Sequence, residues 1–209
     1  MEPVPFIGIS RHRIGVDGKG VTTLAAFHGC PLRCRYCLNA ACLGPSDHFY
    51  HYTPESLYDK VRIDNLYFLA TSGGICFGGG EPLLRVDFIA RFRELCGSAW
   101  RLTAETSLAV PRAAVVRAAE IFDEFIVDIK DANPVIYKRY TGRSNRQALA
   151  NLQWLLDKKG SECVTVRVPL IPEYNCDDDR DRTIDLLHRW GATRIDRFEY
   201  IVRQPQQGT

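Results

Sequence analysis

The chain is organised around Val21-Thr22-Thr23-Leu24-Ala25-Ala26-Phe27-His28-Gly29-Cys30-Pro31-Leu32-Arg33-Cys34-Arg35-Tyr36-Cys37, an apolar run followed at once by three cysteines. The run 21–27 is apolar and rich in β-branched residues, which is typical of a strand buried on both faces. Cys30, Cys34 and Cys37 follow it at C-x3-C-x2-C spacing. Such a tight loop can wrap one face of a cubane cluster, and thiolates are the ligands that iron–sulfur centres require. The sequence therefore predicts a strand that ends in a metal-binding loop.

The number of cysteines in this loop decides between a reactive and a structural metal site. Three thiolates leave one iron of a 4Fe-4S cluster without a protein ligand, and an open coordination position marks a reactive site. A structural zinc site normally needs four ligands, and His28 adjoins the motif rather than standing at zinc-ligand spacing. Cys42 is a candidate fourth thiolate, which would close the cluster into an electron carrier. The open cluster is the favoured interpretation, and the zinc module and the carrier stay as alternatives.

Further apolar runs alternate with segments of helical periodicity, which is the pattern of βα units around a parallel sheet. The predicted strands are 21–27, 74–77, 100–106, 124–129, 163–170 and 195–201. The predicted helices are 54–65, 85–96, 111–121, 145–159 and 178–190, and 172–179 is expected to be exposed loop. We therefore expect an α/β fold, a partial (β/α)6 TIM-like barrel of parallel strands. The cluster loop should follow the first strand, and the site should lie at the carboxyl ends.

Bulk properties describe an ordinary globular chain. Its 209 residues suffice for a single domain over 1–209, with a core at about 15–202 and a polar tail at 203–209. The net charge of +2, with 27 cations dispersed among 25 anions, argues against a nucleic-acid partner. The sequence contains no apolar run of membrane-span length and no signal peptide, so we expect no membrane partner and a cytoplasmic location, where thiols stay reduced.

A second motif, Gly78-Gly79-Gly80-Glu81-Pro82, follows the second predicted strand. Together with the three cysteines and Tyr36, which stands just before the third of them, it resembles the radical SAM superfamily. The resemblance implies that the cysteines hold a 4Fe-4S cluster whose open iron binds S-adenosylmethionine (SAM). It also implies that Gly79, Gly80 and Glu81 bind the SAM amino group, since glycine lets the backbone approach a ligand and a carboxylate pairs with an ammonium. Tyr36 is counted among the cofactor-binding residues through the same match.

Other stretches resemble one branch of that superfamily, the glycyl-radical-enzyme activating enzymes of the pyruvate formate-lyase activating enzyme type. They are 15–21, which contains Asp17-Gly18-Lys19-Gly20, then 124–130, which ends in Asp128-Ile129-Lys130, and 163–172. The resemblance implies that Lys130 and Arg167 hold the SAM carboxylate, as two cations facing one anion. It also implies a monovalent cation beside SAM, held by the oxygen ligands that hard cations prefer, at Glu105, Thr106 and Asp128. Glu105 replaces the aspartate usual in that branch.

The resemblance further implies an activity and a set of partners. An electron from flavodoxin or ferredoxin would reduce the cluster, and SAM would be cleaved to methionine and a 5'-deoxyadenosyl radical. That radical would take a hydrogen atom from a glycine of a partner glycyl radical enzyme. We expect a monomeric, oxygen-sensitive enzyme whose chain positions SAM and shields the radical, so initiation requires no side-chain acid or base.

Departures from the activase pattern keep other functions open. Lys19 stands where those enzymes usually carry proline, and Tyr200-Ile201-Val202-Arg203-Gln204 lacks their histidine motif. Both departures favour direct modification of a peptide or small-molecule substrate, whereas the small size of the chain and the motif at 17–20 favour an activase. A non-catalytic iron–sulfur carrier is a third candidate, and it would show no SAM turnover.

Overall fold

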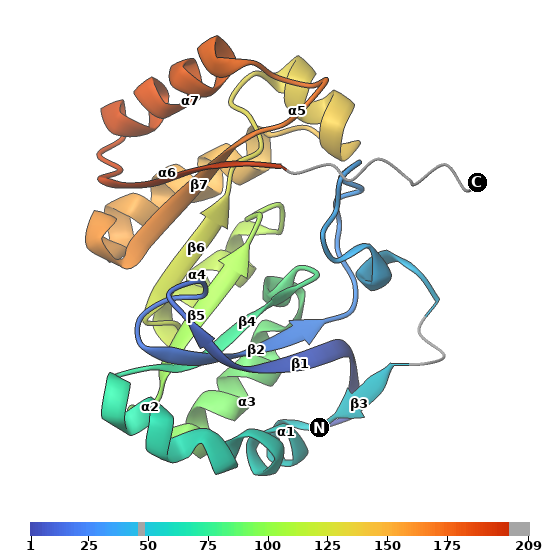
Figure 1. The fold of residues 1–209 in the computed structure, drawn as a ribbon, viewed down its shortest axis with the longest axis vertical. Helices are drawn as coiled ribbons and strands as arrows, with labels where there is room; N and C mark the ends of the chain where they lie inside the picture. Colours follow the sequence, from blue (N-terminus) through green and yellow to red (C-terminus); the bar gives the residue numbers. More distant parts are fainter. Residues whose placement is uncertain (46–48, 201–209) are drawn as a thin grey trace, which may run out of the picture.

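A computed structural model describes residues 1–45 and 49–200 as one curved sheet with helices packed on its outer face (Figure 1). The strands are β1 (Val4–Ile14), β2 (Val21–Phe27), β3 (Tyr50–Tyr52), β4 (Gly74–Gly79), β5 (Arg101–Thr106), β6 (Glu124–Asp128), β7 (Val164–Leu170) and β8 (Arg194–Glu199). The helices are α1 (Pro54–Val61), α2 (Asn65–Thr71), α3 (Val86–Cys96), α4 (Arg112–Ile121), α5 (Pro134–Thr141), α6 (Arg146–Lys159) and α7 (Asp177–Arg189). None of these helices combines the length and the apolar character that crossing a bilayer requires.

The strands form one row in the order β3-β1-β2-β4-β5-β6-β7-β8. From β2 to β8 each strand is parallel to the next, so the carboxyl ends of six strands meet at one edge. β1 and β3 are antiparallel additions on the β2 side. The parallel row confirms the α/β class and the partial (β/α)6 arrangement predicted from the sequence, and the sheet is open rather than closed.

The antiparallel strands β1 and β3 have no counterpart among the predicted strands. β1 lacks a continuous apolar run, because Gly8 and the polar segment 10–13 interrupt it, and Phe6 is its one buried residue. β3 is only 3 residues long. The cysteine loop therefore follows the second strand of the chain rather than the first, although β2 is still the first strand of the parallel row.

The helices depart from the predicted segments at four places. α2 is the first, since no helix was predicted over 66–71. α5 was not predicted, because its aromatic residues weaken the helical pattern of the sequence. The N-cap residue Asn133 and Pro134 at the first helical position nevertheless favour a helix start there. The segment 54–65 ends as an α-helix at Val61 and continues through a short 3-10 turn. α7 begins inside the stretch expected to be loop, since three aspartates in its first turn favour the helix dipole. The end of the predicted strand 195–201 and the tail 203–209 lie outside the described residues.

Aromatic side chains in the core hold the ends of the strands that carry the two motifs. Phe27, the last residue of β2, stacks on Phe6 with ring centroids 4.3 Å apart and on Phe77 of β4 at 5.7 Å. Phe77 in turn meets Phe92 of α3 edge-on at 5.4 Å. Such aromatic pairs each contribute about 0.5–1.5 kcal/mol beyond their buried area. This packing therefore positions the cysteine loop relative to the glycine motif.

A buried carboxylate joins β1 to the rest of the fold. Asp64 is fully buried and accepts hydrogen bonds from Arg11 Nε at 2.9 Å and Thr23 Oγ1 at 2.9 Å, and it contacts His12 Nε2 at 3.0 Å. Arg11 and His12 are consecutive, so a regular strand would point them to opposite faces. The register of β1 shifts between Ser10 and Arg13, and His12 takes a φ of 56° there. The bulge turns both side chains onto the same carboxylate.

Replacing this carboxylate should destabilise the fold. Burial alone would raise the pKa of Asp64, but the hydrogen bonds from Arg11 and Thr23 outweigh it and lower that pKa below its usual range. Asp64→Ala is expected to lower the free energy of unfolding by about 2–3 kcal/mol at neutral pH in urea denaturation. Because the folded-state pKa is lowered, the wild-type advantage should disappear as pH falls through that lowered value. Asp59→Ala, which removes an exposed ion pair with Arg62, should change stability by less than about 0.5 kcal/mol.

Candidate active site

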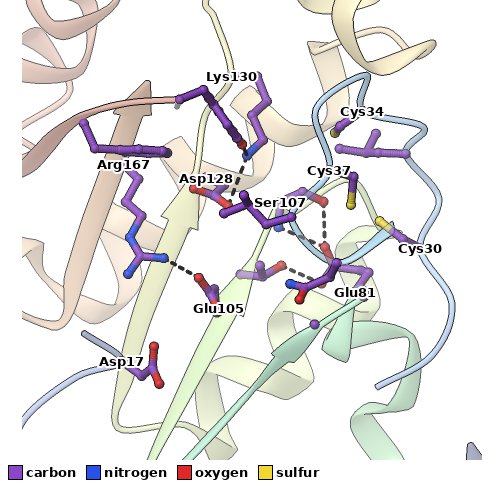
Figure 2. A pocket seen from close by; sticks show the side chains of 18 of the residues that line it. Asp17, Cys30, Cys34, Cys37, Glu81, Glu105, Ser107, Asp128, Lys130 and Arg167 are labelled. Atoms are coloured by element: carbon purple, nitrogen blue, oxygen red, sulfur yellow. Dashed lines mark hydrogen bonds and ion pairs between the residues drawn. The ribbon is translucent and has the colours of Figure 1, made fainter. Parts of the chain in front are cut away.

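A cavity of about 390 Å³ opens at the carboxyl ends of the parallel strands (Figure 2). Loops and strand ends from β2 to β8 supply its walls, the end of β1 supplies Arg13, and the turn after β1 supplies Asp17. Every predicted site residue except Tyr36 lines it: Cys30, Cys34, Cys37, Gly79, Gly80, Glu81, Glu105, Thr106, Asp128, Lys130 and Arg167. The fold thus brings together residues that lie more than 130 positions apart in the sequence.

The cysteine loop is held by backbone hydrogen bonds on both sides of Cys34. Arg33 N donates to Thr141 O at 2.9 Å and Arg35 N donates to Tyr140 O at 3.1 Å, so the loop is fixed to the last turn of α5. Earlier in the loop, Gly29 N donates to Cys42 O at 2.9 Å. These bonds give the three thiols a defined orientation toward the cavity before any ligand is present.

The arrangement of the thiols fits a cubane cluster better than a single metal ion. Among the described residues, no three Cys, His, Asp or Glu side chains converge on one ion. In a 4Fe-4S cluster each thiolate binds a different iron, so no such convergence is needed. The hydroxyl of Tyr137, buried on α5 beside the loop, has no partner among the described residues, and a cluster sulfur is an acceptor of the kind it lacks.

The acidity of the thiols also bears on metal binding. Burial raises the pKa of Cys30 to about 12 and that of Cys34 to about 11. A hydrogen bond from Cys42 lowers the pKa of Cys37 to about 6. Cys42 itself is buried outside the cavity lining, so it supports Cys37 rather than presenting a fourth thiolate to the cavity. Cluster binding must therefore displace protons from Cys30 and Cys34.

The glycine motif packs directly against the cysteine loop. Gly80 N donates to Phe27 O at 2.9 Å and Glu81 N donates to Gly29 O at 2.8 Å. A Cβ at Gly80 would lie 2.2 Å from Gly29 O, and Gly79 has a φ of 83°. The predicted role of these glycines was close backbone approach to a ligand. In this structure they also allow close approach of two backbone segments, since no side chain fits between them.

Gly80→Ala should therefore disturb the metal loop. The new methyl group collides with a backbone carbonyl, which cannot move aside as a flexible side chain would. We expect the variant to lose about 1–3 kcal/mol of folding free energy and to bind less iron after anaerobic reconstitution. Gly44→Ala, whose Cβ would come no closer than 3.7 Å to its nearest neighbour, is the matched control. Equal iron content in both variants would contradict this role of Gly80.

Glu81 is held rigidly at the floor of the cavity. Its carboxylate is almost fully buried and accepts four hydrogen bonds: from Thr106 Oγ1 at 2.6 Å, Leu83 N at 3.2 Å, Ser107 N at 2.9 Å and Ser107 Oγ at 2.6 Å. Burial raises its pKa, and the hydrogen bonds from Ser107 and Thr106 oppose that shift. Ser107 was not predicted as a site residue, because a single serine after a strand forms no motif with its neighbours in the sequence. Thr106, predicted as a cation ligand, is engaged with Glu81.

Lys130 and Asp128 form a pair at the end of β6. Lys130 Nζ lies 3.2 Å from Asp128 Oδ2 and donates to the Tyr200 hydroxyl at 3.0 Å. Burial would lower the pKa of Lys130, but the Asp128 carboxylate keeps it well above its ordinary value, so the ammonium stays charged. Asp128 Oδ1 is buried without a partner among the described residues. That oxygen is available to a bound cation or to a hydrogen-bond donor of a ligand. Tyr200 begins the stretch 200–204, where activating enzymes carry a histidine motif that this chain lacks.

Arg167 does not lie at the end of its strand, because β7 continues for three residues after it. It stands in the middle of β7 and forms ion pairs with Glu105 of β5 and with Asp196 of β8, whose Oδ2 is 3.2 Å from Arg167 Nε. Figure 2 shows Arg167 and Glu105 on one side of the cavity and the three cysteines on the other. Lys130 and Arg167 therefore line the same cavity with different partners. That Lys130 and Arg167 both bind the SAM carboxylate stays a prediction.

Tyr36 is the one predicted residue placed elsewhere. Its hydroxyl donates to Glu173 Oε2 at 3.0 Å, and its ring meets Tyr174 edge-on with centroids 5.8 Å apart. These contacts attach the cysteine loop to the segment before α7. A cofactor contact of Tyr36 stays a prediction.

Comparison with known proteins shows the family of the chain. Residues 25–187 match the family model of the Radical SAM superfamily, so the chain belongs to that superfamily. A (2S)-3-sulfopropanediol dehydratase activating enzyme of Klebsiella oxytoca is 35% identical over 149 residues, which cover 69% of this chain and 46% of the relative. A pyruvate formate-lyase-activating enzyme of Listeria monocytogenes is 30% identical over 177 residues, covering 80% of this chain and 69% of the relative. The predicted resemblance to activating enzymes is confirmed, and this chain spans less than half the length of the Klebsiella protein.

Solved structures share the fold. Streptococcus suis SuiB bound to S-adenosylmethionine superposes with a TM-score of 0.64 at 12% identity, over 84% of this chain and 39% of SuiB. TYW1 with a lysine-pyruvate adduct superposes with a TM-score of 0.59 at 13% identity, over 89% of this chain and 67% of TYW1. At these identities the similarity concerns the arrangement of strands and helices.

Proposed function

We propose that the chain cleaves SAM reductively and uses the resulting radical to remove hydrogen from a glycine of a partner glycyl radical enzyme. The observation that carries this proposal is the convergence on one cavity of three fixed thiols, a rigid carboxylate and a buried ammonium. The names of the curated relatives, which are activating enzymes, favour this branch over other members of the superfamily.

The residues divide into a metal-binding side and a ligand-binding side. Cys30, Cys34 and Cys37 would hold the 4Fe-4S cluster, and when bound it supplies the electron that cleaves SAM. Glu81, fixed by its donors, would attract the SAM ammonium, with Gly79 and Gly80 beside it. Lys130 would bind the SAM carboxylate, since its charge is held in a buried position close to the thiols.

The charge of the cavity suits a ligand with positive groups. Its lining contains five carboxylates, from Asp17, Glu81, Glu105, Asp128 and Asp196, against three cations, from Arg13, Lys130 and Arg167. SAM carries an ammonium and a sulfonium, so this balance favours it over a purely anionic ligand. The unpartnered Asp128 oxygen supports a monovalent cation beside SAM.

The proposal is tested by anaerobic reconstitution with iron and sulfide, followed by incubation with SAM and a chemical reductant. Chromatography should detect 5'-deoxyadenosine and methionine in equal amounts. Electron paramagnetic resonance should then detect a glycyl radical on a candidate partner mixed with the loaded protein. SAM cleavage with a radical on no glycyl radical enzyme would instead favour a peptide or small-molecule substrate. Failure to cleave SAM with a full complement of iron would overturn the proposal.

A further inference from the structure

Helix α5 carries two tyrosine hydroxyls that are buried and lack a hydrogen-bond partner within residues 1–45 and 49–200. They belong to Tyr137 and Tyr140, whose side chains are fully buried. A buried hydroxyl without an acceptor costs free energy, so native proteins rarely keep one unless a water, an ion or a cofactor accepts the bond. Such a hydroxyl therefore points to an acceptor outside the polypeptide.

The buried face of α5 packs against the cysteine loop (Figure 1). The backbone carbonyls of Tyr140 and Thr141 hold the residues on either side of Cys34. Thr141 Oγ1 also donates to Tyr137 O at 2.8 Å, one helical turn earlier. Residues four positions apart lie on one face of a helix, so Tyr137 shares the face that carries the loop. Both hydroxyls therefore start from a face that is fixed to the segment around Cys34.

The surroundings of the two hydroxyls differ. Burial raises the pKa of Tyr137, and among nearby groups Cys34 has the largest further effect in the same direction, with Lys130 opposing it. Burial also raises the pKa of Tyr140, but there Tyr200 has the largest further effect, and the two rings have centroids 6.1 Å apart. The Tyr137 hydroxyl therefore lies toward the thiol of Cys34 and keeps its proton at neutral pH, whereas that of Tyr140 lies toward Tyr200.

We propose that Tyr137 donates a hydrogen bond to a sulfur atom of the bound cluster beside Cys34 and thereby raises the reduction potential of the cluster. This inference rests on the proposed function, because it assumes that the cysteine loop holds a 4Fe-4S cluster. On reduction the cluster takes one electron from an external reductant, which is oxidised by one electron, and no bond forms or breaks. Because the reduced cluster is more negative, a hydrogen-bond donor favours it over the oxidised cluster, and iron–sulfur potentials depend on such bonds.

The test is a redox titration of the reconstituted protein without SAM, in which electron paramagnetic resonance follows the reduced cluster. Tyr137→Phe removes one oxygen atom and keeps the ring, so it should bind as much iron as the wild type. We expect the equilibrium constant for reduction to fall about tenfold, which for a one-electron couple is a shift of about 59 mV to a more negative potential. Tyr140→Phe removes an equally buried hydroxyl from the same helix and should leave the potential close to the wild-type value.

Two further measurements separate the proposed bond from a packing role. Without a cluster the Tyr137 hydroxyl has no acceptor, so Tyr137→Phe should leave the urea midpoint of the apoprotein unchanged or raise it. A hydroxyl that served the fold itself would lower that midpoint when removed. Electron–nuclear double resonance of the reduced wild type, compared in H2O and D2O, should detect an exchangeable proton coupled to the cluster, and Tyr137→Phe should lack that signal.

The outcomes are distinguishable. A lower potential in Tyr137→Phe alone, with loss of the exchangeable proton, supports the hydrogen bond. Equal potentials in Tyr137→Phe and the wild type would overturn it, and weaker SAM binding in that case would assign the hydroxyl to SAM. Equal shifts in Tyr140→Phe would overturn it too, as a general effect of changing α5. If the wild type assembled no cluster, both proposals would fail, whereas the expected potential shift in a protein that does not cleave SAM would overturn the proposed function alone.

Discussion

Cys34→Ala is expected to abolish SAM cleavage while leaving the chain folded. Cys34 lines the cavity, and backbone bonds of Arg33 and Arg35 fix its place independently of the thiol. Removing the thiol therefore removes one of three cluster ligands without releasing the loop. After anaerobic reconstitution, we expect the variant to lack most of the iron and the visible absorbance of the wild type. 5'-Deoxyadenosine should not be detected, because the cluster that cleaves SAM needs all three thiolates to be held.

The matched control is Cys163→Ala, which removes a cysteine that lies outside the cavity lining. It should bind iron and cleave SAM as the wild type does. If Cys34→Ala retained a full cluster, another ligand would have to replace its thiol, and Cys42, which adjoins Cys37, would be the first residue to replace in a double variant.

Lys130→Met is expected to weaken SAM binding by about 100-fold or more. The ammonium is buried, and a ligand carboxylate that loses a buried, charge-assisted partner loses about 2–5 kcal/mol of binding free energy. Asp128 would also lose its partner, and its uncompensated charge would repel the same carboxylate. Equilibrium binding of SAM to the reconstituted protein measures the effect, and iron content shows whether the cluster is intact.

Two further variants make the result specific to the charge of Lys130. Lys130→Arg keeps a cation but not the compact ammonium, so it should recover part of the affinity. Tyr200→Phe removes the hydroxyl that accepts from Lys130 Nζ and leaves the charge, so its loss should be smaller than that of Lys130→Met. Unchanged SAM affinity in Lys130→Met with an intact cluster would assign the carboxylate to Arg167 instead.

The residues selected from the sequence share one cavity, whereas several details of the fold were not predicted. Cysteine spacing and a resemblance carried by short motifs are local features, and eleven of the residues they select line one cavity. The roles of these residues stay predictions. β1 was missed because its stability depends on pairing with β2 and on the contact of Arg11 with Asp64, not on an apolar run. Ser107 and Tyr200 were not identified as site residues, because their roles arise from contacts with Glu81 and Lys130 that no spacing encodes.

The partners of Arg167 illustrate the same limit. The predicted strand 163–170 ends at the same residue as β7, so it places Arg167 three residues before the strand end. Its ion pairs with Glu105 of β5 and Asp196 of β8 depend on the register across the sheet, which a motif does not record.

Because the cysteine loop is attached to α5 and to the glycine motif, folding of the chain and binding of the cluster are separate events. In small zinc domains the chain folds only when the metal arrives, so the ion organises its own ligands. Here hydrogen bonds from Arg33, Arg35, Gly80 and Glu81 organise the loop from protein contacts alone. We therefore expect the chain to fold before it binds a cluster. Loss of the cluster to oxygen should leave a folded apoprotein that can be reconstituted, rather than an unfolded chain.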